Sequence, residues 1–320
     1  MTRAIALDKI RQGKRFLVTC HVRPDADALG SALGLAAVLD AVGKEAIVFS
    51  EGGVPPLLTF LEGKERVVDR VPDLKFDATF IMDAAAEELV PVLPSASITG
   101  PVIIVDHHAA HDGFGDIIVR EIDACATGEV VLRMAHDLGL NPVPTPAAQP
   151  LYAAIVADTG GFRYPSTRAV THQLAAELLA RGVDPWSVAS NLFERWSVAR
   201  MSLLGEVLRA MQVEDAGRIA IVCVDRGMMS RSGASDDLIE GMVNYGRMLD
   251  GVRIAALLWQ PLGKEGEVKV SLRSGEGADV ATVAVALGGG GHRTAAGATL
   301  RTSLDQARAR VLDAVRAQLG

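Results

Sequence analysis

The chain has 320 residues, a formal net charge of −7 and no run of basic residues, which argues against a long track for a nucleic-acid polymer. Its length predicts about two domains, and no stretch reaches the roughly 18 uninterrupted apolar residues that a membrane-spanning helix needs. The N-terminal segment lacks the apolar core of a secretory signal, and the three cysteines form no CxxC pair. We therefore expect a soluble, cytoplasmic protein with no membrane partner.

The first half of the chain alternates short Val- and Ile-rich runs with Ala- and Leu-rich stretches, a pattern typical of a parallel sheet with helices on both faces. The predicted strands are 15–20, 46–50, 78–82, 102–105, 117–119 and 151–157. The predicted helices are 32–41, 130–138 and 168–181, with a rigid proline-containing connector at 142–146. Polar motifs follow these strands, and the carboxyl ends of parallel strands lie at one edge of a sheet.

The second half predicts a smaller lobe of mixed structure. Residues 186–211 read as helix, and we place a helical linker at 186–215 between a metal-binding catalytic domain (1–185) and a substrate-binding domain (216–320). The predicted strands of the second domain are 218–224, 253–259 and 267–272, and its predicted helices are 235–249, 279–286 and one from about Ser303. The expected fold class is α/β, with two domains.

The charges divide unevenly between the two halves. Residues 1–185 contain 16 Lys and Arg against 24 Asp and Glu, whereas residues 186–320 contain 16 against 15. A phosphate group would be repelled by the acidic half unless metal ions reverse the local field, so the less acidic half is expected to supply the anion contacts.

The first polar motif, HVRPDAD, places His21, Asp25 and Asp27 directly after a predicted strand. Two carboxylates two residues apart repel each other unless a cation lies beside them. Divalent ions accept carboxylate and imidazole ligands. The motif therefore predicts a metal site.

Two isolated acids end further predicted strands. Asp83 follows the apolar run 78–82, and a carboxylate placed between other ligands is suited to bridge two metal ions. Asp158 ends the apolar run 151–157 and precedes Thr159-Gly160-Gly161-Phe162, so we expect it to be the last metal ligand. Phe162 and Tyr164 are candidates either for packing or for stacking on a base.

The third motif, Asp106-His107-His108, follows a Val- and Ile-rich run. Adjacent side chains point to different sides in an extended segment, so the two imidazoles are expected to have different roles. We assign His107 to metal and His108 to the scissile phosphate or the leaving group. Asp106 is expected to orient an imidazole.

The second lobe contains the glycine-rich segment 288–297, GGGGHRTAAG. Consecutive glycines before a predicted helix expose N–H groups for an anion, so Gly290 and Gly291 are candidate phosphate contacts. His292 follows them, and Arg273 ends the preceding strand; both are candidate contacts for the substrate's terminal phosphate.

These motifs together resemble those of the DHH phosphoesterase family. HVRPDAD, Asp83, Asp106-His107-His108 and Asp158-Thr159-Gly160-Gly161-Phe162 are similar to its four motifs, and GGGGHRTAAG with Leu272-Arg273-Ser274 is similar to its DHH-associated C-terminal domain. With no sensory or membrane domain, the chain resembles the NrnA-type branch of oligoribonucleases that also dephosphorylate adenosine 3′,5′-bisphosphate (pAp).

The resemblance implies a hydrolase with two divalent ions, Mn²⁺ first and Mg²⁺ or Co²⁺ as alternatives. It implies His21, Asp25 and Asp83 on one ion, Asp27, Asp83, His107 and Asp158 on the other, and a water between them as nucleophile. His108 would contact the scissile phosphate, with Arg273 and His292 facing it. The implied substrates are pAp, giving AMP, and RNA oligomers of about two to five nucleotides, with a homodimer formed through the first lobe.

Other functions compete with this interpretation. The GGGGH segment argues against a family II pyrophosphatase, and the lack of further domains argues against a RecJ-like exonuclease. A phosphodiesterase acting on cyclic di-AMP or its linear product pApA remains an alternative, because the same chemistry serves any small phosphodiester. A regulator that binds nucleotides without catalysis is the alternative from another class.

Overall fold

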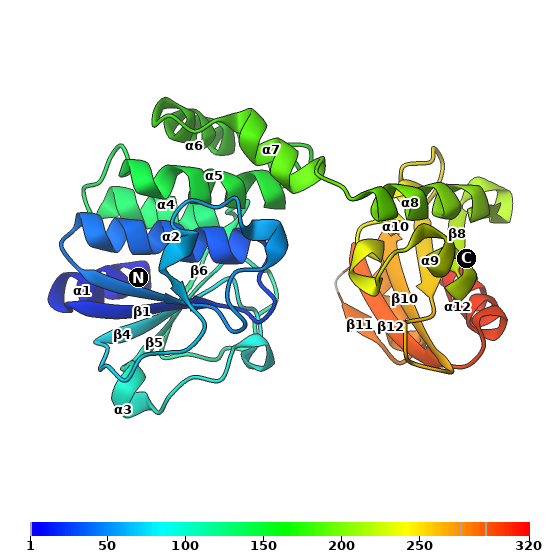
Figure 1. Cartoon of the computed structure of the whole chain (residues 1–320), viewed down its shortest axis with the longest axis horizontal. Helices are drawn as coiled ribbons and strands as arrows, with labels where there is room; N and C mark the ends of the chain where they lie inside the picture. Colours follow the sequence, from blue (N-terminus) through cyan, green and yellow to red (C-terminus); the bar gives the residue numbers. More distant parts are fainter. Residues whose placement is uncertain (1, 276, 292) are drawn as a thin grey trace. The chain divides into compact units, whose positions relative to one another are not determined.

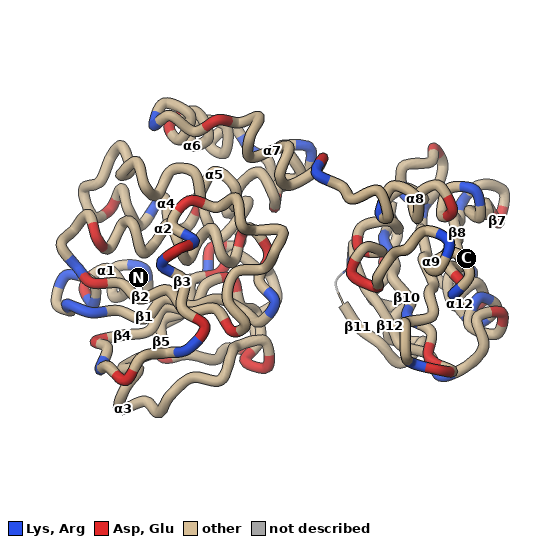
Figure 2. The backbone as a smooth tube through the Cα atoms, in the orientation of Figure 1, with Lys and Arg blue, Asp and Glu red and all other residues tan. Residues whose placement is uncertain are grey.

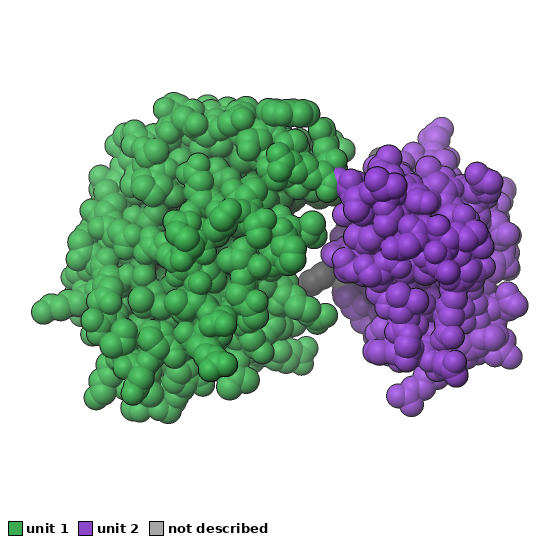
Figure 3. Space-filling view, in the orientation of Figure 1, with its two compact units in different colours: residues 1–195 green, residues 196–320 purple. Residues whose placement is uncertain are grey.

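The computed structural model describes residues 2–275, 277–291 and 293–320. The chain divides into two compact units, residues 1–195 and 196–320 (Figure 3). Every buried apolar cluster lies wholly within one of these units. Within the described residues, no helix combines the length and apolar character needed to cross a membrane.

The first unit is built on a six-stranded sheet in which all neighbouring strands are parallel, as predicted. In spatial order the strands are β3 (Val67–Val68), β2 (Glu45–Phe49), β1 (Arg15–Cys20), β4 (Ala78–Met82), β5 (Val102–Asp106) and β6 (Ile117–Arg120). The order reverses between β1 and β4, and ligands of open parallel sheets bind where this reversal occurs. The segments after β1 and β4 carry the first two polar motifs.

Long helices cover only one face of this sheet (Figure 1), which corrects the expectation of helices on both. They are α1 (Thr2–Gln12), α2 (Ala26–Ala41), α4 (Thr127–Asp137) and α5 (Thr145–Asp158). The opposite face, with Leu17 and Ile104, is covered by loops and by the four-residue helix α3 (Ala96–Thr99). Prolines at 91, 94 and 101 explain this, because proline interrupts helix hydrogen bonding.

The predicted strand 151–157 is wrong, because this segment forms the buried C-terminal half of α5. An apolar run of this length does not distinguish a buried strand from a buried helix. Helix α5 packs on α2 in the opposite direction, with Ala154 against Gly30 and Leu151 against Gly34. The last residue of α5 therefore lies near the first turn of α2.

The remaining helices of the first unit are α6 (Ala169–Ala180) and α7 (Pro185–Phe193). The second unit begins with α8 (Val198–Ala210), whose N-cap Ser197 accepts a hydrogen bond from the Arg200 N–H. The segment predicted as a linker, 186–215, is thus shared: α7 belongs to the first unit and α8 to the second.

The second unit has a mixed six-stranded sheet. In spatial order its strands are β11 (Gly290–Gly291), β12 (Ala295–Arg301), β10 (Glu267–Ser274), β9 (Ile254–Trp259), β8 (Ile219–Val224) and β7 (Gln212–Glu214). Helices α11 (Val280–Ala286) and α12 (Leu304–Leu319) pack on one face, and α8, α9 (Arg226–Ser232) and α10 (Val243–Arg247) pack on the other.

Short 3₁₀ turns among the described residues of both units are η1 (Pro56–Leu58), η2 (Lys64–Arg66), η3 (Glu87–Leu89), η4 (Asp215–Gly217) and η5 (Asp236–Ile239).

Two predictions for this unit are wrong. The helix expected at 235–249 is broken into η5 and α10, because Gly241 between them has a φ of +81°. The glycine segment precedes a strand rather than a helix: Gly290 pairs with Gly297 and Gly291 with Ala296 in the β11–β12 ladder. Among the described residues of this segment, no helix begins after the glycines, so the expected anion pocket at a helix N-terminus is not seen there.

Candidate metal centre

Four segments of the first unit bring acidic and histidine side chains to one place. The segments after β1, β4 and β5 do so because the carboxyl ends of these neighbouring strands share one edge of the sheet. Asp158 arrives by a different route, at the C-terminal end of α5 beside the first turn of α2. The convergence predicted from the sequence is found, although one of its four segments is a helix.

The six predicted metal ligands fall into two groups. Within each group, the atoms that could bind a metal ion lie within 4.8 Å of one another. One group is His21, Asp25 and Asp83, and the other is Asp27, His107 and Asp158. Asp83, His107 and His108 also satisfy the same distance limit. This mixture of carboxylate oxygens and imidazole nitrogens is the donor set that divalent ions such as Mn²⁺ accept.

Asp83 belongs to the first group and adjoins the second. Its Oδ2 is 3.8 Å from Nε2 of His21, and its Oδ1 is 3.7 Å from Nε2 of His107. The residue has a left-handed φ of +58°, a conformation that aspartate tolerates better than most residues. Burial, followed by the charge of Asp25, raises the pKa of Asp83 to about 6. One carboxylate thus offers an oxygen to each ligand group.

Asp27 is completely buried in the first turn of α2. Its carboxylate accepts hydrogen bonds from the Ser31 hydroxyl (3.0 Å) and from the N–H groups of Thr127 (2.7 Å) and Gly128 (3.0 Å) at the start of α4. Burial and then the charges of Asp83 and Asp158 raise its pKa well above the ordinary value. A bound cation would remove this electrostatic cost, so the residues fit a metal ion.

His107 lies among these carboxylates. Its Nε2 is 3.0 Å from Oδ2 of Asp158, and its Nδ1 lies 3.3 Å from the Ala124 carbonyl oxygen, to which it donates. Burial lowers the pKa of His107, but the hydrogen bond to Asp158 and the charge of Asp27 outweigh this and raise it to about 10. A divalent ion at this position would take the place of the His107 proton.

His108 is held differently from His107. Its Nδ1 lies 2.7 Å from Oδ1 of the buried Asp106 and 3.5 Å from Oδ1 of Asp83. The hydrogen bond to Asp106 raises the pKa of His108. Burial alone would raise the pKa of Asp106, but the hydrogen bond and charge of His108 lower it overall.

The candidate phosphate contacts belong to the second unit. Arg273 lies near the end of β10, half-buried, with its guanidinium donating to the Leu272 carbonyl at 3.0 Å. Gly290 and Gly291 are exposed in β11. His292 lies outside the described residues, so its predicted role stays a prediction.

Sequence reasoning missed the segment that supports the centre from the side of α4. Ala124 accepts from His107, Thr127 and Gly128 donate to Asp27, and the Thr127 hydroxyl donates to Asp83. From the sequence, only a helix at 130–138 was expected in this region, with no role for the residues that precede it. The available signal was that exposed N–H groups at a helix start bind anions, and carboxylates are anions.

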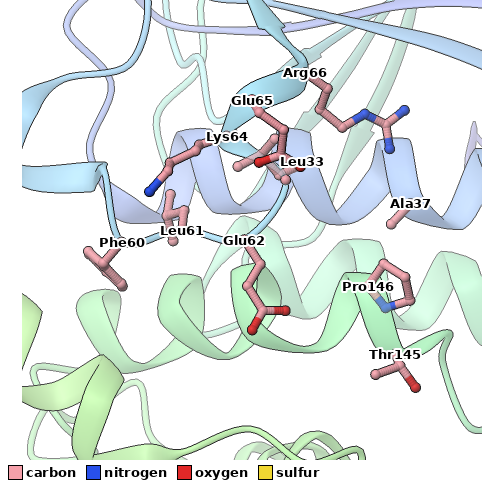
Figure 4. Close-up of a pocket in the computed structure, with 11 residues that line it drawn as sticks. Leu33, Ala37, Phe60, Leu61, Glu62, Lys64, Glu65, Arg66, Thr145 and Pro146 are labelled. Atoms are coloured by element: carbon pink, nitrogen blue, oxygen red, sulfur yellow. The ribbon is translucent and has the colours of Figure 1, made fainter.

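A separate pocket of about 560 Å³ lies at the other end of the α2–α5 pair (Figure 4). Leu33 and Ala37 of α2, the segment 60–66, and Thr145 and Pro146 of α5 line it. It contains none of the predicted site residues. The chemistry of the metal centre is therefore not located in this pocket.

Comparison with known families gives matches in both halves of the chain. Residues 15–155 match the model described as DHH family, N-terminal domain, and residues 217–320 match the DHHA1 domain. The DHH match includes every predicted ligand except Asp158, and the DHHA1 match includes Arg273 and the glycine segment.

Individual relatives agree with these matches. The bifunctional oligoribonuclease and PAP phosphatase NrnA of Thermus thermophilus is 36% identical over 97% of this chain and 92% of its own length. The Bacillus subtilis protein of the same name is 27% identical over 88% of this chain and 87% of its own. The crystal structure of an exopolyphosphatase-related protein from Bacteroides fragilis has a TM-score of 0.90 at 24% identity, covering 99% of this chain and 96% of that one, so the fold is shared.

Proposed function

Since the chain belongs to the DHH family of phosphoesterases and carries a DHHA1 domain, we propose that it hydrolyses short oligoribonucleotides to mononucleotides and dephosphorylates pAp to AMP. The observation that carries this proposal is that Asp83 offers one carboxylate oxygen to each of two adjoining ligand groups. A two-metal phosphoesterase needs this arrangement, because a shared carboxylate holds two ions close together.

We assign the ligands as the family resemblance implies. His21, Asp25 and Asp83 would hold one ion, and Asp27, Asp83, His107 and Asp158 would hold the other. When bound, the ions would supply positive charge to the phosphate oxygens and lower the pKa of a water for attack on phosphorus. We propose Mn²⁺ as the natural ion, because it accepts both carboxylate and imidazole ligands. Mg²⁺ and Co²⁺ are the alternative ions.

His108 is proposed as the general acid. Asp106 fixes the orientation of its ring through Nδ1, which leaves Nε2 as the atom that carries the transferable proton. The ring that carries this proton lies beside the candidate metal centre, with Nδ1 3.5 Å from Oδ1 of Asp83. His108 would donate it to the leaving oxygen of the substrate.

A small substrate fits the distribution of charge. Lys and Arg are scattered along both units in Figure 2, and the formal net charge is negative. Affinity for long nucleic acids depends on many basic contacts with phosphate groups. A mononucleotide or short oligomer needs fewer of them.

Arg273, Gly290, Gly291 and His292 are proposed to bind the remaining phosphate or the far end of the substrate. The guanidinium of Arg273 matches phosphate geometry, and the exposed glycines allow close approach of a phosphate to the backbone.

The expected homodimer and the cytoplasmic location are also proposals. Light scattering of the purified chain would test the first.

The test is Mn²⁺-dependent turnover on a matched panel: pAp, 5′-labelled RNA from dimers to 24-mers, pApA, cyclic di-AMP and pyrophosphate. Turnover of pAp and the shortest RNAs to mononucleotides is the expected result. Faster turnover of cyclic di-AMP or pApA would assign the protein to the breakdown of cyclic dinucleotides. Tight binding of nucleotides without turnover of any substrate would identify a regulator and overturn the proposal.

A further inference from the structure

Thr127 is a fully buried polar residue that contacts carboxylates of both candidate ligand groups. Its N–H donates to Oδ2 of Asp27 at 2.7 Å, and its hydroxyl donates to Oδ1 of Asp83 at 2.9 Å. Through these two bonds a single residue links Asp27 of one ligand group with Asp83 of the other.

The usual structural reason for threonine at a helix start is absent here. Such residues normally stabilise a helix as its N-cap, with the side-chain oxygen accepting a backbone N–H. The N-cap of α4 is Ala126, which makes no side-chain capping bond, and Thr127 is the first residue inside the helix. Its hydroxyl is directed to Asp83 instead, as a donor.

We propose that Thr127 is a positioning residue that fixes the rotation of the Asp83 carboxylate between the two ion sites; this inference rests on the proposed two-metal function. A carboxylate can rotate about its bond to Cβ, but a bridge requires one oxygen to face each ion. The hydroxyl proton of Thr127 occupies one lone pair of Oδ1 and leaves the other for the His107 side. Oδ2 is then held toward His21.

The segment that carries Thr127 is itself firmly held. Glu129, which is completely buried, accepts hydrogen bonds from the Cys125 N–H (3.0 Å), from Arg168 (3.0 Å) and from Arg133. A Cβ at Gly128 would lie 2.7 Å from Cβ of Ala154, so the start of α4 also packs tightly on α5. Such support makes Thr127 a fixed reference point for the carboxylate.

The test compares Thr127→Val with Thr127→Ser by calorimetric titration of the metal-free protein with Mn²⁺ alone. Valine keeps the shape and the N–H to Asp27 but removes the hydroxyl, whereas serine keeps the hydroxyl. We expect Thr127→Val to weaken Mn²⁺ binding by about 10–100-fold at one or both sites, and Thr127→Ser to stay within about threefold of the natural protein.

Thr79→Val is the matched control. Thr79 is also fully buried and lies in β4, four residues before Asp83, but its hydroxyl donates to the Thr99 carbonyl at 2.8 Å. This variant should keep the natural affinity for Mn²⁺. Equal Mn²⁺ affinities in Thr127→Val and Thr79→Val would overturn the proposal, as would a loss in Thr127→Ser as large as that in Thr127→Val.

Two further outcomes can be distinguished from a failure of the Thr127 proposal. If Thr127→Val does not fold, Thr127→Ala takes its place in the comparison with Thr127→Ser, and equal Mn²⁺ affinity of those two variants overturns the role of the hydroxyl. If the natural protein binds Mn²⁺ but hydrolyses no member of the substrate panel, the proposed function fails, while the Mn²⁺ titrations still decide the role of Thr127.

Discussion

Asp106 and His108 form a carboxylate–imidazole pair, with Oδ1 of Asp106 2.7 Å from Nδ1 of His108. The carboxylate is fully buried, and the other oxygen, Oδ2, has no hydrogen-bond partner among the described residues. An ionised carboxylate can only accept, so Nδ1 of His108 must donate. The pair therefore keeps a proton on Nδ1 and raises the pKa of the imidazole.

Replacing Asp106 by asparagine should move the pH profile of kcat. Removal of the carboxylate lowers the pKa of His108, so the protonated acid is lost at a lower pH than in the natural protein. The alkaline limb of the profile should shift toward acid, and kcat at neutral pH should fall by about 10–100-fold. An unchanged alkaline limb would exclude His108 as the general acid.

Replacing His108 by alanine should separate chemistry from metal binding. The Mn²⁺ content of the protein should remain near that of the natural chain, while kcat falls by about 10²–10⁴-fold, the usual contribution of a general acid. Metal analysis and single-turnover kinetics on pAp measure the two quantities. A loss of Mn²⁺ equal to that in His107→Ala would instead make His108 a ligand.

Binding of Mn²⁺ should strengthen with pH. The pKa of His107 is raised to about 10 in the metal-free protein, so the ring is protonated at neutral pH and an ion must displace that proton. The dissociation constant should therefore fall by up to about tenfold for each unit of pH between about 6.5 and 8.5. Calorimetry in buffers of different ionisation enthalpy would count the proton released.

His136→Gln is the control for that titration. His136 pairs with Glu177 at 3.0 Å, away from the centre, so its replacement should leave the pH dependence unchanged. A pH-independent Mn²⁺ affinity in the natural protein would contradict the assignment of His107 as a ligand.

Two helical glycines should respond oppositely to alanine. A Cβ at Gly30 of α2 would lie 2.5 Å from the Pro150 carbonyl oxygen, so Gly30→Ala should destabilise the first unit by about 1–3 kcal/mol. A Cβ at Gly205 of α8 meets no described atom within 4 Å, so Gly205→Ala should stabilise the second unit by about 0.5–1 kcal/mol. Hydrogen exchange of the backbone amides in α2 and α8 measures the stability of each unit separately. Protection from exchange that changes in the same direction in both variants would refute the packing argument.

Tyr164 is a candidate contact for a nucleic-acid base. Phe162 stacks on His172 with 5.1 Å between ring centroids, whereas Tyr164 is 41% exposed and its ring lies against Gly160, two residues from Asp158. Tyr164→Ala should raise KM for pAp by about 5–100-fold, the range for one lost base stack. Tyr164→Trp should retain affinity, and Trp186→Ala, at another exposed aromatic of the first unit, should have no effect. Equal KM values in Tyr164→Ala and Trp186→Ala would rule out the contact.

The convergence of the proposed ligands was predictable because most of them follow strands. His21, Asp83 and His107 each come within one or two residues of the end of a Val- or Ile-rich run, and parallel strands bring such positions together. Asp158 lies beside the other candidate ligands, but at the end of α5 rather than at the end of the predicted strand. Thr127 was not predictable in this way, because its role depends on where α4 begins in space.

Predictions of fold failed where local composition is ambiguous. Residues 151–157 are uniformly apolar, which suits a buried strand as well as the buried helix that forms. The glycines at 288–291 permit many backbone conformations, and pairing of Gly290 and Gly291 with β12 decides between them. In the first case the deciding contacts come from α2, distant in the sequence, and in the second they come from a strand that begins only a few residues later.

The separate apolar cores of the two units have a consequence for how the enzyme could be altered. All six proposed metal ligands lie before residue 196, whereas the proposed contacts for the substrate's other phosphate, Arg273, Gly290, Gly291 and His292, lie after it. A recombinant chimera that joins this metal-binding half to the C-terminal half of a relative would leave both interiors intact. Under the proposed assignments, the metal chemistry and the second unit's contacts with the substrate could then diverge independently, by exchange of one half at the short segment between α7 and α8.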